Sequence, residues 1–233
     1  MKNLLHSIYN RLASLTLGNW LLGGVMLFLA IGSFLQGEGS TINDVPLLFW
    51  LREVPLAESW WLWVSLLLLA LLALNTVLCS IDSLSAKWQR GSFLSRIAPQ
   101  AMHLGFLLIM VAHLQSAVGS FKQTVQVEQG SGITFPDGSR VTFTDFTATY
   151  SPMGMPTAFS ATFSYPGGNA TISPNHPFFY QGHGIYLKDV APPPTKAALV
   201  EVHKEPGAGM ALAGGLIFTV ANIILLFRRR GRS

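Results

Sequence analysis

Two histidines in one apolar segment are the residues of this 233-residue chain best suited to chemistry. His103 and His113 both lie within residues 98–118, which contain no Asp, Glu, Lys or Arg. A polar side chain is costly inside a membrane and usually faces protein or water there. The residues alone leave three roles open for each histidine: a hydrogen bond between packed helices, a proton relay, or ligation of haem or another metal by a neutral imidazole.

The spacing of these two histidines limits what they can bind together. On a helix, ten residues separate the two rings by about 15 Å along the axis and by about 80° around it. One metal ion therefore cannot be bound by both. The other long apolar segments contain no histidine, so a haem with two histidine ligands at membrane depth would need its second ligand from another subunit.

The single cysteine, Cys79, is a weaker candidate. A lone cysteine forms no intrachain disulfide, and a buried one usually behaves as a small apolar residue. We expect packing for Cys79, with a role as thiol ligand or redox group as the alternative. The sequence contains no recognisable activated nucleophile, carboxylate pair, phosphate-binding loop or cluster of metal ligands. It therefore predicts no catalytic residue, and no metal site other than haem iron.

The composition indicates a membrane protein. Half of the residues are hydrophobic and only 11% are charged, whereas about a quarter of the residues of a soluble domain are charged. This excludes a disordered chain, a nucleic-acid-binding domain and a typical soluble enzyme. Four segments are long and apolar enough to cross a bilayer, namely residues 20–35, 60–81, 98–118 and 207–227. No small-x-small cleavage site follows the first, so we expect a retained span rather than a signal peptide.

The distribution of charges predicts the orientation of these spans. Lys and Arg gather before the first span, between the second and third, and in the tail of residues 228–233, whereas the loop after the first span is mainly acidic. The positive-inside rule therefore places both termini in the cytoplasm and residues 119–206 outside. Residues 1–18 carry leucine and isoleucine at helical spacing, which predicts an amphipathic helix on the cytoplasmic membrane surface. Residues 19–118 hold the first three spans and their loops.

Residues 119–206 predict a small external antiparallel β domain. Apolar and polar residues alternate in six short stretches, and a change of phase at Asp145 predicts a β-bulge. A Pro-Gly-Gly-Asn sequence at residues 166–169 predicts a hairpin turn. The predicted fold is thus four transmembrane α-helices plus a β domain that is a sandwich or an open barrel.

Other polar and aromatic residues favour structural roles. Three tryptophans near the outer end of the second span are typical of anchors at the membrane surface, and small residues on the last span predict close helix packing. These residues are Trp60, Trp61 and Trp63, and Gly207, Ala211, Gly214 and Gly215. The remaining histidines are predicted to lie in turns (His176, His183) or in solvent (His6, His203).

Several short stretches resemble the ResB family, also called CcsB, of cytochrome c biogenesis proteins. Residues 32–36 resemble the end of the family's first span, although its proline is missing, and residues 74–80 (LNTVLCS) resemble the end of its second. Residues 102–109 resemble the opening of its third span. In the β domain, residues 145–154 and 175–186 resemble its Asp-Phe…Tyr-x-x-x-Gly and Asn-x-Pro…Tyr-x-Gly…Ile-Tyr patterns. The order of these motifs follows the family along almost the whole chain.

The resemblance implies a subunit of a bacterial cytochrome c synthase and haem export complex of the System II type. Its partner would be a CcsA-type membrane protein, and the complex would carry haem across the inner membrane and present it to apocytochrome c. A histidine on the family's third span is a haem ligand, and His103 is the matching position. The resemblance thus implies a haem b shared with the partner. It adds little for His113, which stays a weak candidate ligand. The external domain is shorter than is common in the family, which implies a short-form member.

Two other functions remain open from the sequence. The chain could be a scaffold subunit that binds no haem and acts in no reaction by itself. It could also be a haem b electron-transfer subunit, although such subunits usually carry histidines on at least two facing spans.

Overall fold

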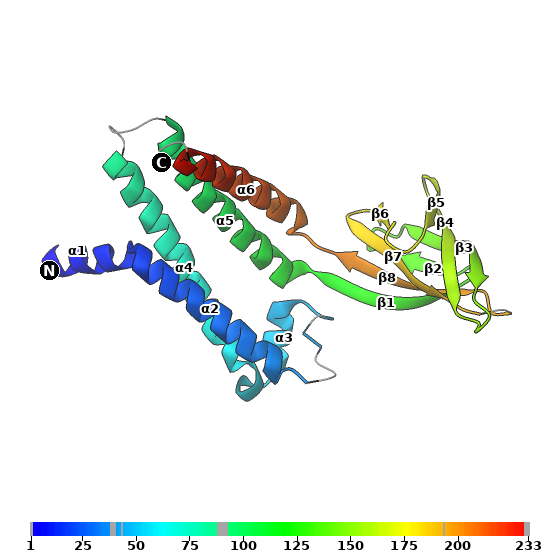
Figure 1. The fold of residues 1–233 in the computed structure, drawn as a ribbon. Coiled ribbons are helices and arrows are strands. Elements are labelled where there is room, and N and C mark those ends of the chain that lie inside the picture. The colour runs from blue at the N-terminus through cyan, green and yellow to red at the C-terminus, as the bar shows by residue number, and fades with distance from the viewer. Residues whose placement is uncertain (1, 38–40, 43, 88–92, 193, 231–233) are drawn as a thin grey trace. The chain divides into compact units, whose positions relative to one another are not determined.

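The computed structural model describes residues 2–37, 41–42, 44–87, 93–192 and 194–230. The chain divides into two compact units. The helical unit comprises Met1–Ile42, Leu47–Val118 and Gly207–Ser233, and the β unit comprises Asn43–Pro46 and Gly119–Pro206. Figure 1 shows the helices of the first unit and the strands of the second.

The described part of the helical unit contains six helices. They are α1 (Lys2–Leu12), α2 (Leu15–Leu35), α3 (Leu47–Glu53), α4 (Leu56–Lys87), α5 (Phe93–Gly119) and α6 (Ala208–Arg230). Four of them, α2, α4, α5 and α6, are long and apolar enough to cross a membrane, over Leu15–Leu35, Leu56–Ser85, Arg96–Gly119 and Ala208–Phe227. The predicted set of four membrane-spanning helices is confirmed.

The first two helices meet at a capped junction. Ser14 has an extended backbone, and its side chain accepts a hydrogen bond from the Leu17 N–H at 3.2 Å, which begins α2. The span therefore starts before the predicted residue 20, and α1 ends before the predicted residue 18. The short helix α3 was not predicted, because seven residues between two prolines are too short for a span.

Helices α2 and α4 approach closely because glycines of α2 face larger side chains of α4. Three pairs line the contact: Gly32 with Trp61, Gly24 with Leu68, and Gly18 with Asn75. A Cβ added to Gly32 would lie only 2.1 Å from the Trp61 ring. The three α4 residues recur every seven positions, the repeat of helices that pack nearly antiparallel.

The role predicted for Trp61 is wrong. Its side chain lies inside this contact rather than on the exposed surface of the helix, with 4% of the residue exposed, and its indole N–H donates to the Glu58 carbonyl at 2.9 Å. Trp60 and Trp63 remain exposed on the same helix.

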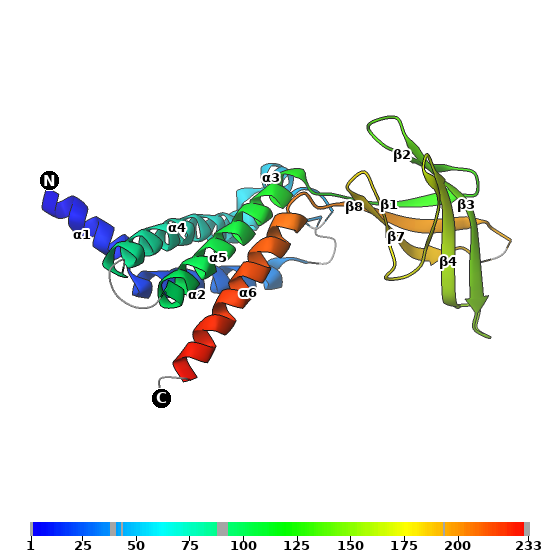
Figure 2. The ribbon, with the colours of Figure 1, turned by 90° about the horizontal axis from the view of Figure 1, so that it is seen from above.

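Helices α5 and α6 lie side by side in both ribbon views (Figures 1 and 2). A Cβ on Gly105 would lie 2.7 Å from the Gly214 carbonyl oxygen, and one on Gly207 would lie 2.1 Å from that of Ala112. The small-residue face of the last span thus brings two backbones together within the chain. Gly215 does not share in it, since its Cβ position is open within the described part of the chain.

The β unit consists of two four-stranded antiparallel sheets, with strand orders β1-β8-β7-β6 and β2-β3-β4-β5. The strands are β1 (Phe121–Glu128), β2 (Gly132–Thr134), β3 (Arg140–Tyr150), β4 (Pro156–Tyr165), β5 (Gly168–Ile172), β6 (Phe178–Tyr180), β7 (His183–Val190) and β8 (Ala197–Lys204). Inward side chains of both sheets form one apolar core, with Phe143 and Phe163 from one sheet and Ile185 and Val200 from the other. The described strands form a sandwich without a closed barrel.

The strand predictions are confirmed for the longer strands. The register of β3 and β4 shifts between Phe143 and Asp145, as the predicted bulge requires. The strands β2 and β6 were missed because each has only three residues, too few for an alternating pattern to be recognised.

Candidate functional site

His103 lies on α5, and its ring is half-buried against α4. The ring atom Nδ1 lies 2.6 Å from the Ser80 hydroxyl oxygen of α4. This hydrogen bond fixes the orientation of the ring between two spanning helices. It occupies one ring nitrogen and leaves Nε2 as the atom able to bind a metal. A half-buried imidazole held in this way fits an axial ligand of haem iron.

Two polar residues of α4 bind the α1–α2 junction. Asn75 Nδ2 donates to the carbonyl oxygens of Leu12 at 2.5 Å and Ser14 at 3.0 Å. The Cys79 thiol, one turn further along, donates to the Ala13 carbonyl at 3.0 Å. The structure thus uses Cys79 as a hydrogen-bond donor at a helix junction.

The neighbouring face of α4 carries hydroxyl groups. Thr76 Oγ1 donates to the Leu72 carbonyl and Ser80 Oγ to the Thr76 carbonyl, both at 2.8 Å. Ser80 is the only member of the pair in contact with His103 among the interactions of the described residues. The segment LNTVLCS therefore has two roles. One face of it binds the α1–α2 junction through Asn75 and Cys79, and the neighbouring face orients His103 through Ser80.

His113 is not brought into this site. It is exposed, and it has no hydrogen-bonding or ionic partner within the described ranges. The two histidines of α5 thus differ: one is fixed between helices and the other faces away from the rest of the described helical unit.

Two histidines of the β unit, His183 and His203, pack against aromatic rings. His183 Nδ1 lies 3.0 Å from the Gln181 carbonyl oxygen, and its ring packs against Phe135. His203, predicted to be solvated, is partly buried with its ring against Tyr186. Over the described residues, no three His, Cys, Asp or Glu side chains are placed to hold a metal ion.

Glu201 is the centre of a charged cluster on the β unit. Its carboxylate lies 3.2 Å from Lys188 Nζ and 3.5 Å from Lys122 Nζ, on β7 and β1 on either side of β8. Burial raises the pKa of Glu201, but the hydrogen bond and charge of Lys188, together with Lys122 and His203, outweigh burial and hold that pKa below its ordinary value. The cluster therefore ties three strands together through a carboxylate that stays ionised at neutral pH.

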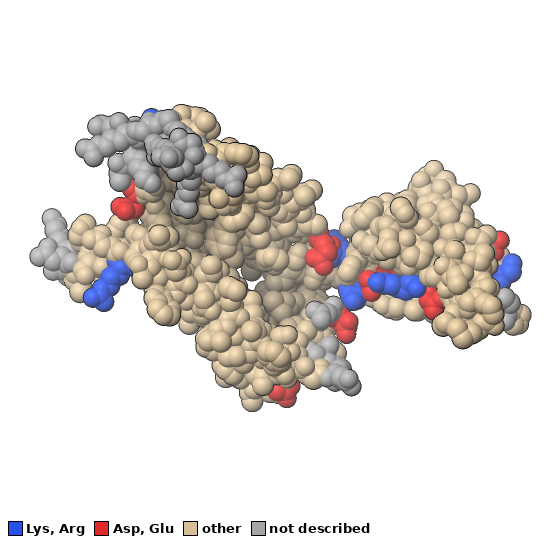
Figure 3. Space-filling view, in the orientation of Figure 1, with Lys and Arg blue, Asp and Glu red and all other residues tan. Residues whose placement is uncertain are grey.

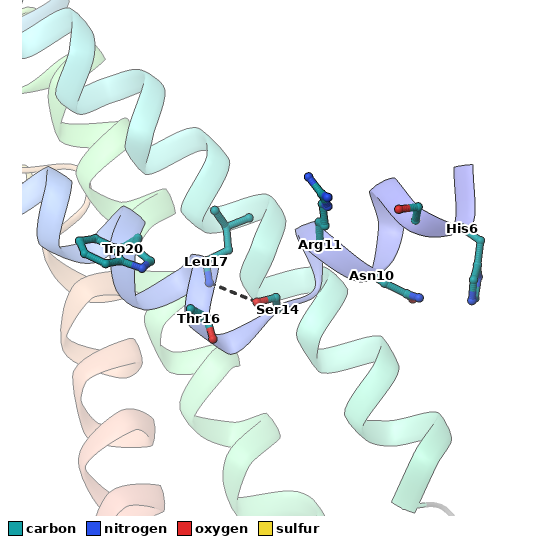
Figure 4. A pocket seen from close by; sticks show the side chains of 8 residues that line it. His6, Asn10, Arg11, Ser14, Thr16, Leu17 and Trp20 are labelled. Carbon is teal, nitrogen blue, oxygen red and sulfur yellow. Dashed lines mark hydrogen bonds between the residues drawn. The ribbon is translucent and has the colours of Figure 1, made fainter. Parts of the chain in front are cut away.

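An open groove lies along α1 and the first turns of α2. Figure 4 shows His6, Asn10 and Arg11 on one side of the Ser14 cap and Thr16, Leu17 and Trp20 on the other. A basic side chain and a tryptophan that line one groove are typical of the headgroup region of a membrane. This groove adjoins the helix junction that Asn75 and Cys79 bind.

The spans leave much of their surface uncovered. Only 11% of the most apolar window of α5, and of α6, is buried within the chain. Uncharged side chains cover the middle of the helical unit on the face drawn in Figure 3. An apolar groove follows α5 and α6 and is lined by residues such as Ile97, Ala101, Leu216 and Val220. Lipid or a partner subunit must cover this surface in a membrane.

A comparison with protein families identifies the chain. The model described as the ResB-like family matches residues 83–197, from the end of α4 to the start of β8, and this range includes His103. The chain belongs to the ResB-like family. Family membership supports a role in cytochrome c biogenesis for this ResB-like chain and a multi-pass membrane location.

The chain was also compared with solved structures and with curated proteins. A solved structure similar to the ResB-like chain is "Cytochrome c Heme Lyase CcmF", with a TM-score of 0.49 and 14% sequence identity. The similarity covers 88% of this chain and 34% of that one, so the ResB-like chain spans about a third of the other's length. No curated protein matches the sequence.

Sequence reasoning missed Ser80 as part of the site. The signal for it was present: Asn75 and Thr76 are followed one helical turn later by Cys79 and Ser80 on a membrane span. A polar stripe inside a span needs partners in the protein. The stripe lies near the same end of the helical unit as His103, so His103 could have been predicted as that partner.

Proposed function

We propose that this ResB-like chain is a subunit of a cytochrome c synthase and haem export complex. With a CcsA-type partner, it carries haem across the bacterial inner membrane and presents it for attachment to apocytochrome c. Membership of the ResB-like family supports this proposal. The single observation that carries it is the imidazole of His103, which is fixed by Ser80 with its Nε2 left for a ligand.

In this proposal, His103 supplies one axial ligand to a haem b. When bound, the haem would offer its iron for coordination by this imidazole. The other spans of this chain contain no histidine, so the second protein ligand comes from the partner subunit. The uncovered apolar faces of α5 and α6 support such an arrangement, because they leave room for a partner beside the helix that bears His103.

The charge pattern supports the membrane orientation that this proposal needs. Basic residues lie before the first span, between the second and third spans and after the last, and by the positive-inside rule they favour both termini inside and the β unit outside. Seven residues, or about 10 Å of helix, separate His103 from Arg96 at the start of its span. His103 therefore binds haem in the cytoplasmic half of the membrane, and the β unit acts on the side where apocytochrome c is matured.

The experiment is the haem content of the complex. The ResB-like chain is co-expressed with a CcsA-type partner, purified through a tag on this chain, and measured by haem absorbance per complex. We expect His103→Ala to lose most of the haem while the two subunits still copurify. The matched control is His113→Ala, which removes the same side chain from the same helix and should keep its haem.

The result also separates the alternative functions. A scaffold subunit would show the same low haem content with and without His103, and a complex that matures apocytochrome c without this chain would exclude the proposal. An electron-transfer subunit would bind haem through His103 but leave cytochrome c maturation unchanged when the chain is removed.

A further inference from the structure

Ser80 makes two hydrogen bonds with one hydroxyl group. Its oxygen lies 2.8 Å from the Thr76 carbonyl oxygen and 2.6 Å from His103 Nδ1. A carbonyl oxygen can only accept, so the single proton of the hydroxyl is donated to Thr76. The bond to the ring then needs a proton on Nδ1, which the Ser80 oxygen accepts.

This arrangement determines which ring nitrogen carries the lone pair. A neutral imidazole has one N–H and one unprotonated nitrogen. With the proton on Nδ1, Nε2 carries the lone pair that binds a metal. We propose that Ser80 is a positioning residue, which holds His103 in the tautomer that ligates haem iron through Nε2; this inference rests on the function proposed above.

The surroundings of Ser80 keep its hydroxyl in place. Its acceptor belongs to the backbone of α4, so it cannot rotate away. Asn75, on the same stretch of α4, is bound to the α1–α2 junction. Ser80 therefore contacts α5 from a helix, α4, whose other face is bound to the α1–α2 junction.

The same helix provides a matched control. Ser65 is fully buried, and its hydroxyl donates to the Trp61 carbonyl at 2.8 Å, the same bond within one helix that Ser80 makes to Thr76. Among the contacts of the described residues, only Ser80 adds a histidine to this bond. Ser65→Ala therefore removes an equivalent hydroxyl from α4 without touching His103.

The test compares Ser80→Ala, Ser80→Thr and Ser65→Ala in the complex with its partner. Three quantities are measured: recovery of the intact complex, the rate of haem loss to an excess of a soluble haem scavenger, and the midpoint potential of the haem. Loss of a hydrogen bond to a metal-ligating histidine lowers metal affinity by roughly 10- to 100-fold. We expect Ser80→Ala to weaken haem retention by about this factor.

The midpoint potential is the readout that a purely structural role would not move in a defined direction. The N–H···O bond makes the imidazole a stronger donor to iron, and a stronger donor favours the oxidised state. Ser80→Ala should therefore shift the potential to more positive values. Ser80→Thr keeps the hydroxyl and should restore both retention and potential, and Ser65→Ala should leave both unchanged.

Each other outcome has one meaning. If His103→Ala loses haem but Ser80→Ala behaves like Ser65→Ala, the inference about Ser80 is overturned and the proposed function stands. If Ser80→Thr is as defective as Ser80→Ala, the hydroxyl is not the active feature and the inference is again overturned. If His103→Ala keeps its haem, the proposed function itself fails.

Discussion

The two units of the molecule place their polar groups in opposite ways. The β unit buries an apolar core around Phe143 and Phe163 and carries Glu201 on the other face of its sheet. The helical unit exposes apolar side chains and keeps Asn75 and Ser80 inside helix contacts. Water drives apolar burial in a sheet sandwich, whereas lipid is as apolar as the side chains, so close packing and hydrogen bonds join the spans. A polar group inside the helical unit therefore marks a contact that is needed, and His103 is one.

The largest effect is expected in the β unit, where removal of a core side chain leaves a cavity. Phe163 is 1% exposed between the two sheets, so Phe163→Ala should destabilise the β unit by about 3–5 kcal/mol. Limited proteolysis of the full chain in detergent would report this as faster cleavage within residues 119–206. Phe179, which is 66% exposed, is the control, because Phe179→Ala removes the same ring from the surface. Equal cleavage of the two variants would contradict the sandwich core.

In the helical unit, a comparable loss of stability is expected from adding a side-chain atom rather than from removing one. Gly32→Ala places a methyl group 2.1 Å from the Trp61 ring, which must move. Overpacking of this kind destabilises a contact by about 1–3 kcal/mol. Thermal unfolding of the purified chain in detergent should show a lower midpoint for Gly32→Ala. Gly23 lies on the same helix with open space at its Cβ position, and a Gly23→Ala midpoint as low as that of Gly32→Ala would refute the packing of α2 on α4.

The polar contacts of α4 should contribute less than its packing. Asn75→Ala removes both hydrogen bonds to the α1–α2 junction, and such bonds between membrane helices contribute about 0.6–2 kcal/mol. We expect protease access to increase between α1 and α2, near Ala13. Asn222 is the control, since among the described residues its amide donates to the Phe218 carbonyl of its own helix and to no other helix. An Asn222→Ala variant cleaved at the same rate would show that Asn75 does not hold the junction.

The smallest effect concerns the charged cluster of the β unit. The pKa of Glu201 is lowered by its basic neighbours despite burial. Its ion pairs therefore stabilise the folded unit above the unfolded pKa of about 4.3, and this contribution is lost as the pH falls through the lower folded value. Glu201→Gln should reduce stability at neutral pH by less than about 1 kcal/mol. The difference between the two proteins should vanish in acid, and a difference that grows in acid would contradict this assignment.

The sequence predicted the parts of the fold that depend on one element at a time. Length and hydropathy found the four spans, and alternation found the six longer strands together with the bulge at Asp145. It missed α3, β2 and β6, because short elements are defined by their neighbours rather than by their own pattern. It also predicted Trp61 to be an anchor at the membrane surface, because the sequence of one span does not reveal that Gly32 of another helix packs against its ring.

The candidate site divides in the same way. His103 could be found from the sequence because an ionisable residue inside a span is conspicuous by its type. The polar stripe of α4 could have indicated that Ser80 has a partner. Its role as hydrogen-bond acceptor could not be predicted, since that role depends on the packing of α4 against α5 and on a hydroxyl proton that is already donated to Thr76. The contrast with His113 likewise needed the structure, as both histidines belong to the same apolar segment.

The most direct test of the account is the rescue of His103→Ala by free imidazole. The purified complex of the ResB-like chain with its CcsA-type partner is supplied with haem and titrated with imidazole while the haem absorbance is recorded, with His113→Ala as the reference. If His103 is a haem ligand, the variant lacks the wild-type haem spectrum and imidazole restores it, because the free ring can occupy the vacated position. A His103→Ala complex with the wild-type spectrum before any imidazole is added would contradict the central claim.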